Sequence, residues 1–346
     1  MVAASNSMVE SMNGTRLYGK AGMRQRAKRV VEAGISCLPW RSLPRRARLM
    51  LIERLCTVME VSEQLAVIRH LAPQLGISAL KTNGEYGTIQ SAATDTNVFA
   101  TYARTGTWAK QTNDLLVAFF RKYDGGTYID IGANIGLTTI PIAKNPKVKC
   151  FAFEPEPVNF GNLSLNIAAN CFHDNVVTHE AGVLDQHCLI DLEIGEGNLG
   201  DHRVHRSDAP GDFGEQRRQI IQVPGVTLDE IIGEVDLPLA VKIDTQGAEP
   251  LVVAGGRRTL AKAELLIMEF WPYGIARLGC DPAPMIDFLE REFEEISIAP
   301  AEGDIPPEPV SSSEACSRLR AMMERDHQVV GSPYCDVIAR RHGGKA

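Results

Sequence analysis

The residues best suited to chemistry in this sequence lie around a short glycine turn at residues 127–136. An apolar strand pattern runs into Asp130, and Gly132 and Gly136 then follow on either side of Asn134, ahead of a helical pattern. Glycines at such a turn let the backbone bend sharply and approach a ligand closely. Dinucleotide-binding turns read GxGxxG, whereas this turn reads DxGxxxG and places an acid at the strand end. The spacing therefore predicts a site for S-adenosylmethionine (SAM) rather than for a pyrophosphate.

A second acid, Glu154, follows the next predicted strand and stands 24 residues after Asp130. This is close to the offset of about 20 residues at which an acidic side chain receives ribose hydroxyls in nucleotide-binding sheets. A carboxylate accepts from both hydroxyls at once. An acid at a strand end can also be merely solvated, but beside the glycine turn Glu154 indicates a nucleotide site.

In this interpretation Lys242 and Asp244 lie where the methyl group is transferred. Side chains alternate along a strand, so both lie on one side of the strand predicted at 239–244, with Asp244 at the ligand edge. Methyl transfer from a sulfonium requires alignment of the acceptor oxygen and a base for its proton. Asp244 can orient or deprotonate an acceptor hydroxyl. A desolvated Lys242 with a lowered pKa can be the base instead, or it can form an ion pair with a neighbouring acid.

Three further residues are candidates for contacts with the acceptor. Glu269 nearly ends the strand predicted at 264–270, and Asn198 and His202 belong to a polar cluster in the segment 195–218. His202 and His205 have a metal-like spacing but lack the helix or thiol context of a metal site. No metal is predicted, although a metal held by Asp244 and nearby acids stays an open alternative.

Alternating strand and helix patterns must position these residues. They predict a Rossmann-like, doubly wound α/β fold with seven main strands, right-handed crossovers and an antiparallel last strand. In such a sheet ligands lie over the carboxyl ends of the strands, where all four candidate acids fall. A two-stranded insertion is expected at 185–223. Besides the strand before the glycine turn, the predicted strands are 147–154, 175–184, 239–244, 264–270, 294–298 and 334–339.

Taken together, these motifs resemble the FkbM family of SAM-dependent methyltransferases. The resemblance covers about residues 95–275. It implies the seven-stranded methyltransferase fold, SAM as cofactor, and O-methylation of a hydroxyl on a small molecule, sugar or glycan. The segments that carry it are the glycine turn, Phe-Glu-Pro-Glu-Pro at 153–157 with Asn166 downstream, Thr-Leu-Asp at 227–229, and Val-Lys-Ile-Asp-Thr-Gln-Gly-Ala-Glu at 241–249.

The resemblance also implies roles for single residues. Glu154 would bind the ribose of SAM, and Asp244 would act at the acceptor. Gln246 stands where the family commonly has Glu, which puts in doubt any role that needs a charge there. The residues that would hold the methionine end of SAM are Asp130, Gly132, Asn134 and Gly136.

Composition divides the chain into three parts. Residues 1–47 are expected to form a disordered or basic N-terminal arm, because the first 60 residues carry a charge of +7 against −7 for the whole chain. Residues 48–112 are expected to form a helical cap or extension, because apolar residues recur there at helical spacing. Residues 113–346 are expected to hold the SAM-dependent methyltransferase domain.

The bulk composition also indicates the protein's compartment and its partners. No run of about 18 apolar residues predicts a transmembrane helix, and the eight cysteines form no CxxC pair. We therefore expect a cytoplasmic protein with reduced thiols. The net acidic body disfavours a nucleic-acid partner, and an oligomer is possible.

Two alternative functions remain from the sequence. One is a SAM-binding module without catalysis. The other is a nicotinamide-dependent oxidoreductase, which the missing GxGxxG turn disfavours.

Overall fold

The computed structural model describes residues 76–171, 173–206, 215–300, 308–327, 329 and 333–341, with isolated positions between 44 and 72. The chain divides into two compact units, Met1–Ile77 and Ser78–Ala346. The basic arm expected at 1–47 lies outside the described residues except at positions 44 and 46, so it stays a prediction. Every described position from 46 to 72 is α-helical. No helix among the described residues is long and apolar enough to cross a membrane.

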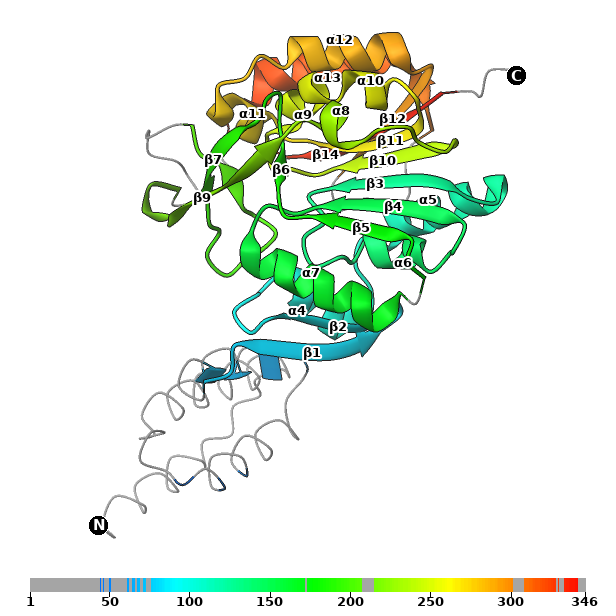
Figure 1. Cartoon of the computed structure of the whole chain (residues 1–346). Coiled ribbons are helices and arrows are strands. Elements are labelled where there is room, and N and C mark those ends of the chain that lie inside the picture. Colours follow the sequence, from blue (N-terminus) through cyan, green and yellow to red (C-terminus); the bar gives the residue numbers. More distant parts are fainter. Residues whose placement is uncertain are drawn as a thin grey trace, which may run out of the picture. The chain divides into compact units, whose positions relative to one another are not determined.

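An eight-stranded sheet forms the centre of the larger unit (Figure 1). Its strands are β3 (Gly126–Ile131), β4 (Val148–Phe153), β5 (Val176–His179), β10 (Leu239–Ile243), β11 (Ala263–Phe270), β12 (Glu295–Pro300), β13 (Val310–Ser311) and β14 (Cys335–Arg340). Their order is β13-β12-β14-β11-β10-β3-β4-β5. Strands β11, β10, β3, β4 and β5 pair in parallel, whereas β14 pairs antiparallel with both β11 and β12. The predicted doubly wound sheet and its antiparallel last strand are confirmed, and the two-residue β13 adds an eighth strand.

Helices cover both faces of this sheet. One face packs on α5 (Lys110–Tyr123), α6 (Thr139–Ala143) and α7 (Pro157–Asn170). The other packs on α8 (Leu228–Ile231), α9 (Glu249–Gly255), α10 (Arg257–Leu260), α11 (Pro272–Leu278), α12 (Ala283–Glu292) and α13 (Ser312–Asp326). All five residues of β10 are buried, as expected of a central parallel strand.

The alternation of side chains along the strands decides which face receives the charges. Val241 and Ile243 of β10 belong to the core with α8–α13, whereas Ala240 belongs to the core with α5 and α6. Lys242 takes the next even position and therefore faces the α5–α6 side. The same alternation on β3 places Asp130 on this face, two residues after Tyr128.

The segment after β5 forms a second sheet of four strands. These are β6 (Gly182–Val183), β7 (Cys188–Glu193), β8 (Arg203–Val204) and β9 (Ile220–Val226), in the order β6-β9-β7-β8. β7 pairs antiparallel with both β8 and β9, so the two strands predicted in the 185–223 insertion are confirmed. Leu184, Ile190 and Leu192 pack with Leu251 and Leu278, which fixes the inserted sheet against α9 and α11.

A β-hairpin precedes the main sheet in the chain. It consists of β1 (Ala79–Gly84) and β2 (Gly87–Ala92), and α4 (Val98–Thr105) follows it. The expected helical extension over 48–112 is therefore wrong for residues 79–92. The hairpin escapes sequence analysis because its apolar residues are few and its strands gain their burial from other elements.

Helix α7 holds this hairpin through asparagine side chains. Asn166 accepts from the Gln90 backbone N–H at 2.7 Å and donates to the Gln90 carbonyl at 2.9 Å. Asn170, one turn later, makes the same pair of bonds with Thr88 at 3.0 and 2.8 Å. Each side-chain amide thus replaces the backbone of a neighbouring strand. Asn166 also donates to the carbonyl of Ile135, at 2.9 Å, which ties the hairpin to the glycine turn.

Candidate active site

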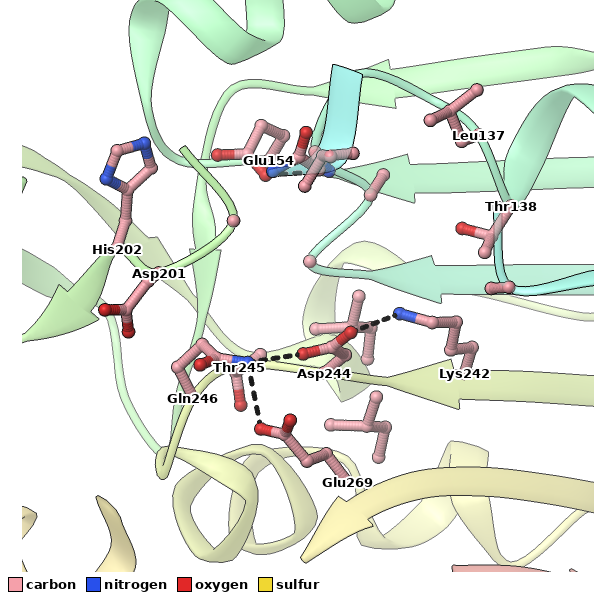
Figure 2. A pocket seen from close by; sticks show the side chains of 18 of the residues that line it. Leu137, Thr138, Glu154, Asp201, His202, Lys242, Asp244, Thr245, Gln246 and Glu269 are labelled. Carbon is pink, nitrogen blue, oxygen red and sulfur yellow. Dashed lines mark hydrogen bonds and ion pairs between the residues drawn. The ribbon is translucent and has the colours of Figure 1, made fainter. Parts of the chain in front are cut away.

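A cavity of about 1190 Å³ opens over the carboxyl ends of β3, β4, β10 and β11 (Figure 2). Pockets for one small molecule usually measure about 300–1,000 Å³, so this cavity has room for a cofactor and an acceptor together. Its walls come from the glycine turn, the inserted sheet, the segment from α4 to α5, and the start of β14. Its polar lining residues include Asn97, Thr101, Asn134, Glu154, Asn198, Asp201, His202, Lys242, Asp244, Gln246, Glu269 and Asp336.

The glycine turn forms one wall through tight backbone contacts. Gly132 has a φ of +81°, and a Cβ there would lie 1.9 Å from the carbonyl oxygen of Asp244. Any other residue would push β3 and β10 apart at the point where they reach the cavity. Asn134, at a φ of +51°, donates its backbone N–H to Glu154 Oε2 at 2.9 Å. Its side chain donates to the carbonyl of Leu199 at 2.8 Å, which holds the inserted segment beside the turn.

Asp130 and Gly136 lie behind this wall and do not line the cavity. Asp130 is fully buried, and its Oδ2 accepts from the hydroxyls of Thr138 and Thr139 at 2.7 and 2.6 Å. Its carboxylate therefore fixes the start of α6. Asp130 and Gly136 were expected to bind the cofactor, but protein atoms surround both of them. They therefore support the turn instead.

Glu154 reaches the cavity from the end of β4. Its Oε1 accepts from the backbone N–H of Glu156 at 2.9 Å, and its Oε2 accepts from that of Asn134. Burial raises the pKa of Glu154 from 4.5 to about 8, although these two amide hydrogen bonds oppose the shift. This carboxyl group can therefore gain or lose its proton near neutral pH.

Lys242 and Asp244 form an ion pair on the cavity floor. Lys242 Nζ lies 3.0 Å from Asp244 Oδ2 and 4.0 Å from Asp130 Oδ1. Burial lowers the pKa of Lys242, but the charges of Asp244 and Asp130 outweigh burial, so the pKa is raised overall. The raised pKa and the ion pair disfavour Lys242 as the base. The alternative of an ion pair with a neighbouring acid is confirmed.

Gln246 connects Asp244 to a second carboxylate (Figure 2). Its Nε2 donates to Asp244 Oδ1 at 2.9 Å and to Glu269 Oε2 at 3.0 Å. Burial raises the pKa of Glu269 well above its usual range, and the negative charges of Asp244, Glu249 and Asp336 add to this. Glu269 lines the cavity, and its contact with the acceptor stays a prediction.

Asp336 is a cavity residue that sequence analysis missed. It pairs with Glu269 across β11 and β14, and burial together with the charge of Asp244 raises its pKa to about 6. Because β14 runs antiparallel, its first residues lie at the ligand edge, where the last residues of the parallel strands lie. An acid near the start of the predicted antiparallel strand was the signal that could have identified it.

The loop that carries Gln246 is held in a strained shape. Gln246 has a φ of +55°, a region that costs a residue with a Cβ about 1–2 kcal/mol. Glu249, fully buried, accepts from the backbone N–H groups of Thr245 at 2.9 Å and Gly247 at 3.0 Å. Gly247 packs so closely that a Cβ would lie 2.5 Å from the carbonyl carbon of Gly274. These contacts keep the loop in place despite the strain.

His202 is held at the cavity by a hydrogen bond. Its Nδ1 accepts from the backbone N–H of Gly195 at 3.0 Å, and burial lowers its pKa to about 4. The ring is therefore neutral with its proton on Nε2, a buried atom with no partner among the described residues. His202 lines the cavity, but its Nε2 is buried and the neutral ring is not placed to act as a base. Asn198, also expected at the acceptor, lines the cavity and accepts from the Gly200 backbone N–H at 3.1 Å.

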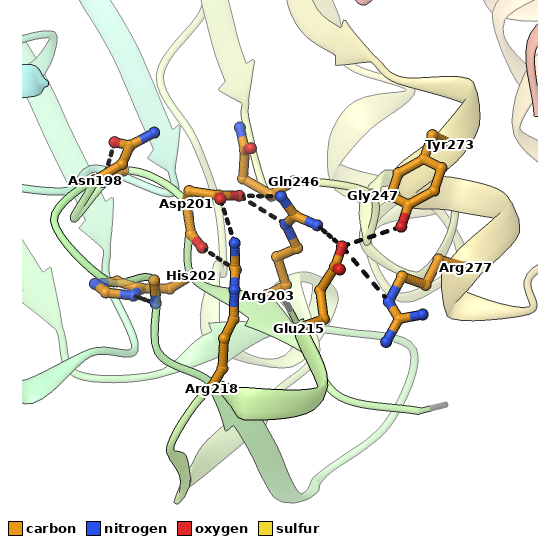
Figure 3. Close-up of polar contacts among 12 residues, drawn as sticks. Asn198, Asp201, His202, Arg203, Glu215, Arg218, Gln246, Gly247, Tyr273 and Arg277 are labelled. Carbon is orange, nitrogen blue, oxygen red and sulfur yellow. Dashed lines mark hydrogen bonds and ion pairs between the residues drawn. The ribbon is translucent and has the colours of Figure 1, made fainter. Parts of the chain in front are cut away.

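A network of ion pairs holds the inserted segment (Figure 3). Arg203 donates to Asp201 Oδ1 at 2.6 Å and to Glu215 Oε1 at 2.7 Å. Arg218 donates to the other oxygen of Asp201 at 2.6 Å, and the Tyr273 hydroxyl donates to Glu215 at 3.1 Å. The network thereby ties the inserted loop to α11. Among the described residues, no group of three or more His, Cys, Asp or Glu side chains is arranged to hold a metal ion.

The fold and this site together define a SAM-dependent methyltransferase. Residues 130–296 match the family model of the methyltransferase FkbM domain. The chain is 26% identical over 231 residues to the 2-O-methyltransferase NoeI of Sinorhizobium fredii (strain NBRC 101917 / NGR234). That match covers 60% of this chain and 88% of NoeI.

Two solved methyltransferase structures are also similar to this chain, each at 13% identity and a TM-score of 0.34. One is the precorrin-6y C5,15-methyltransferase of Geobacter metallireducens GS-15, covering 68% of this chain and 93% of its own. The other is the magnesium protoporphyrin IX methyltransferase of Synechocystis PCC 6803, covering 67% of this chain and 79% of its own.

Proposed function

We propose that the protein transfers a methyl group from SAM to a hydroxyl of a small molecule, sugar or glycan, with Asp244 at the reacting oxygen. The observation that carries this proposal is the position of the Asp244 carboxylate at the end of β10. Its side chain is 39% exposed to the cavity, while Lys242 and Gln246 each hold one of its oxygens. The similarity to a 2-O-methyltransferase supports an oxygen acceptor.

The cavity residues fit SAM as the second ligand. Glu154 would accept from the ribose hydroxyls, and the turn at Gly132 and Asn134 would let the backbone approach the methionine end. SAM supplies an electrophilic methyl group and a positive charge at sulfur. Asp244, Glu269 and Asp336 bring three carboxyl groups to the same side of the cavity, where burial and their mutual repulsion raise the pKa of Glu269 and Asp336. A cationic ligand would relieve this repulsion.

The residues of the chain then have distinct tasks in the reaction. Asp244 orients the acceptor hydroxyl and takes its proton as the oxygen becomes methylated. Lys242 donates to Asp244 Oδ2 and fixes the direction of the carboxylate. Because alignment contributes more than base strength to a direct displacement, these positions matter more than any strongly shifted pKa.

The test is methyl transfer by an Asp244→Asn variant. The wild-type protein is first screened with hydroxylated sugars and glycans for release of S-adenosylhomocysteine (SAH). Loss of the base and its charge is expected to lower kcat by about 100-fold or more, while the Kd for SAH stays within about twofold. Asp191→Asn, on the exposed side of β7, serves as the matched control and should keep full activity. Full turnover by Asp244→Asn would exclude this role.

The remaining expectations from the sequence are separate from this test. Cytoplasmic location, the oligomeric state and the absence of a nucleic-acid partner stay predictions. Cell fractionation, sedimentation and a salt-dependent RNA or DNA binding assay would check them in turn. Wild-type protein that binds SAH but methylates no hydroxyl acceptor would instead support the non-catalytic binding module.

A further inference from the structure

Gln246 combines backbone strain with a long polar side chain, and this combination calls for an explanation. Its φ of +55° lies in the left-handed region, where glycine is free of strain and a glutamine is not. The hydrogen bonds from Thr245 and Gly247 to Glu249 would hold the loop with a glycine equally well. A strained residue that the surrounding structure maintains points to a function for its side chain.

The side-chain amide of Gln246 makes two bonds that no other side chain duplicates among the described residues. Its Nε2 has two hydrogens, and it donates to Asp244 Oδ1 at 2.9 Å and to Glu269 Oε2 at 3.0 Å. The two carboxylates are thus held at opposite sides of one amide. Without that amide they would face each other with no donor between them, and like charges at this distance repel.

The charges around the pair favour a hydrogen-bond donor at this position in this chain. Six charged or titratable groups face each other here, and Lys242 is the single cation among them. Lys242 forms an ion pair with Asp244 and lies near Asp130, on the opposite side of Asp244 from Glu269. The groups are Asp130 on β3, Lys242 on β10, Asp244 just after β10, Glu249 on α9, Glu269 on β11 and Asp336 on β14.

We propose that Gln246 is a positioning residue, which joins Asp244 to Glu269 and thereby aims the Asp244 carboxylate at the acceptor hydroxyl. This inference rests on the proposed role of Asp244 in methyl transfer. A carboxylate of the same length at position 246 would repel both partners, whereas a glycine would release the backbone strain and leave both without the donor. Each substitution therefore separates the side chain's role from the backbone's.

Gln246→Gly tests the link between strain and function. The variant is expected to unfold within about 2 °C of the wild type, because relief of the backbone strain offsets part of the loss of the two hydrogen bonds. Its Kd for SAH should stay within about twofold, while kcat falls at least about tenfold. Gln246→Asn is the matched control, because asparagine tolerates positive φ but is one methylene too short to bridge both carboxylates. It should lose kcat as the glycine variant does. Full activity in either variant would overturn the proposal.

Gln246→Glu tests the electrostatic part through the pH profile of kcat. An added negative charge beside Asp244 favours its protonated form, so the acidic limb of the profile should move to higher pH by about one unit. A role confined to packing would lower kcat without moving this limb. A pH profile that coincides with that of the wild type would therefore contradict the proposal.

Stability against pH gives a measurement that does not depend on turnover. The introduced carboxylate has a folded-state pKa raised by its acidic neighbours, so its destabilising effect is absent below its unfolded pKa and grows as the pH rises. The difference in Tm between Gln246→Glu and the wild type should therefore widen between pH 5 and pH 9. A constant difference would refute the role assigned to Gln246. If the wild type methylates no acceptor, the proposed function fails, whereas this comparison still tests the contacts of Gln246.

Discussion

At the residue scale, Glu154 offers the most direct measurement, because burial raises its pKa to about 8. Below pH 8 the free protein carries a proton on this group, and that proton must leave before the carboxylate can accept from two ribose hydroxyls. The affinity for SAH should therefore rise with pH up to about 8 and then level off. The gain is at most about tenfold per pH unit. Calorimetric Kd values from pH 6 to pH 9 would check this.

The control for this prediction is Glu154→Gln, which has the same shape and no titration. It should bind SAH more weakly, with a pH dependence that reflects only the amino group of the ligand. If the wild type and the variant show the same dependence, Glu154 does not contact the cofactor.

Lys242 should prove important for stability rather than as a proton acceptor. Lys242→Met would leave Asp130 fully buried without a cation, and breaking a buried ion pair in this way costs about 3 kcal/mol or more. Adding Asp130→Asn removes the orphaned charge, so the double variant should regain a large part of the loss. Urea unfolding of the single and double variants would measure this. Equal stabilities for both would show that the two side chains are not coupled.

Sequence reasoning predicted which residues lie at the cavity better than it predicted their burial and charge. Strand alternation and the rule that ligands lie at carboxyl ends were enough to bring Glu154, Asp244 and Glu269 to one edge. The burial of Asp130 depends on Thr138 and Thr139, which a late helix start turns toward it. The charge on Lys242 depends on distances to two acids on different strands. Such quantities arise only from tertiary packing, so spacing along the chain does not contain them.

At the element scale, Asn166 should account for much of the attachment of the hairpin. Asn166→Ala would leave the Gln90 N–H, the Gln90 carbonyl and the Ile135 carbonyl without this partner in a site where Asn166 is 1% exposed. Unpaired buried groups cost about 1–3 kcal/mol each, so we expect a loss of about 3 kcal/mol in the free energy of unfolding. Chemical denaturation would measure it.

Asn170→Ala is the matched control for Asn166. It removes the same pair of bonds, to Thr88, but these bonds are exposed, so water can replace them. The loss should be about 1 kcal/mol or less. Equal losses at the two positions would mean that burial does not decide the strength of these contacts.

The elements of the main sheet were predictable because long apolar runs alternate regularly with helices. The hairpin at 79–92 was not, since its strands are held by α7 and by α4 rather than by a strong pattern of their own. The same reason explains the missed boundary, because a helical cap was expected to continue to residue 112. Local spacing identifies an element only when that element's own residues provide its burial.

At the scale of the whole molecule, the compact unit Ser78–Ala346 predicts where the chain can be shortened. A chain of residues 78–346 keeps its central sheet, its hairpin and the complete cavity lining, so it should fold and bind SAH. A chain of residues 113–346 loses β1, β2 and α4, and with them the cavity wall from Asn97 to Thr112. Thermal unfolding and SAH titration of the two chains would compare them. Equal Tm and Kd values would restore the boundary expected at residue 113.

The contacts between α7 and β2 also show how far a helix can substitute for a strand. Four helical residues rise about 6.0 Å and two strand residues about 6.6 Å. Side-chain amides one helical turn apart therefore have nearly the same spacing as alternate residues of a strand. A third pair of such hydrogen bonds does not form. Asn162 accepts from the Gln90 side chain, at 2.9 Å, and not from the backbone of Ala92. The two pairs of bonds made by Asn166 and Asn170 set the register of α7 against β2. Because alternate residues of β2 point to opposite edges, inserting one residue there would turn the wrong edge toward α7, whereas inserting two would preserve the pairing.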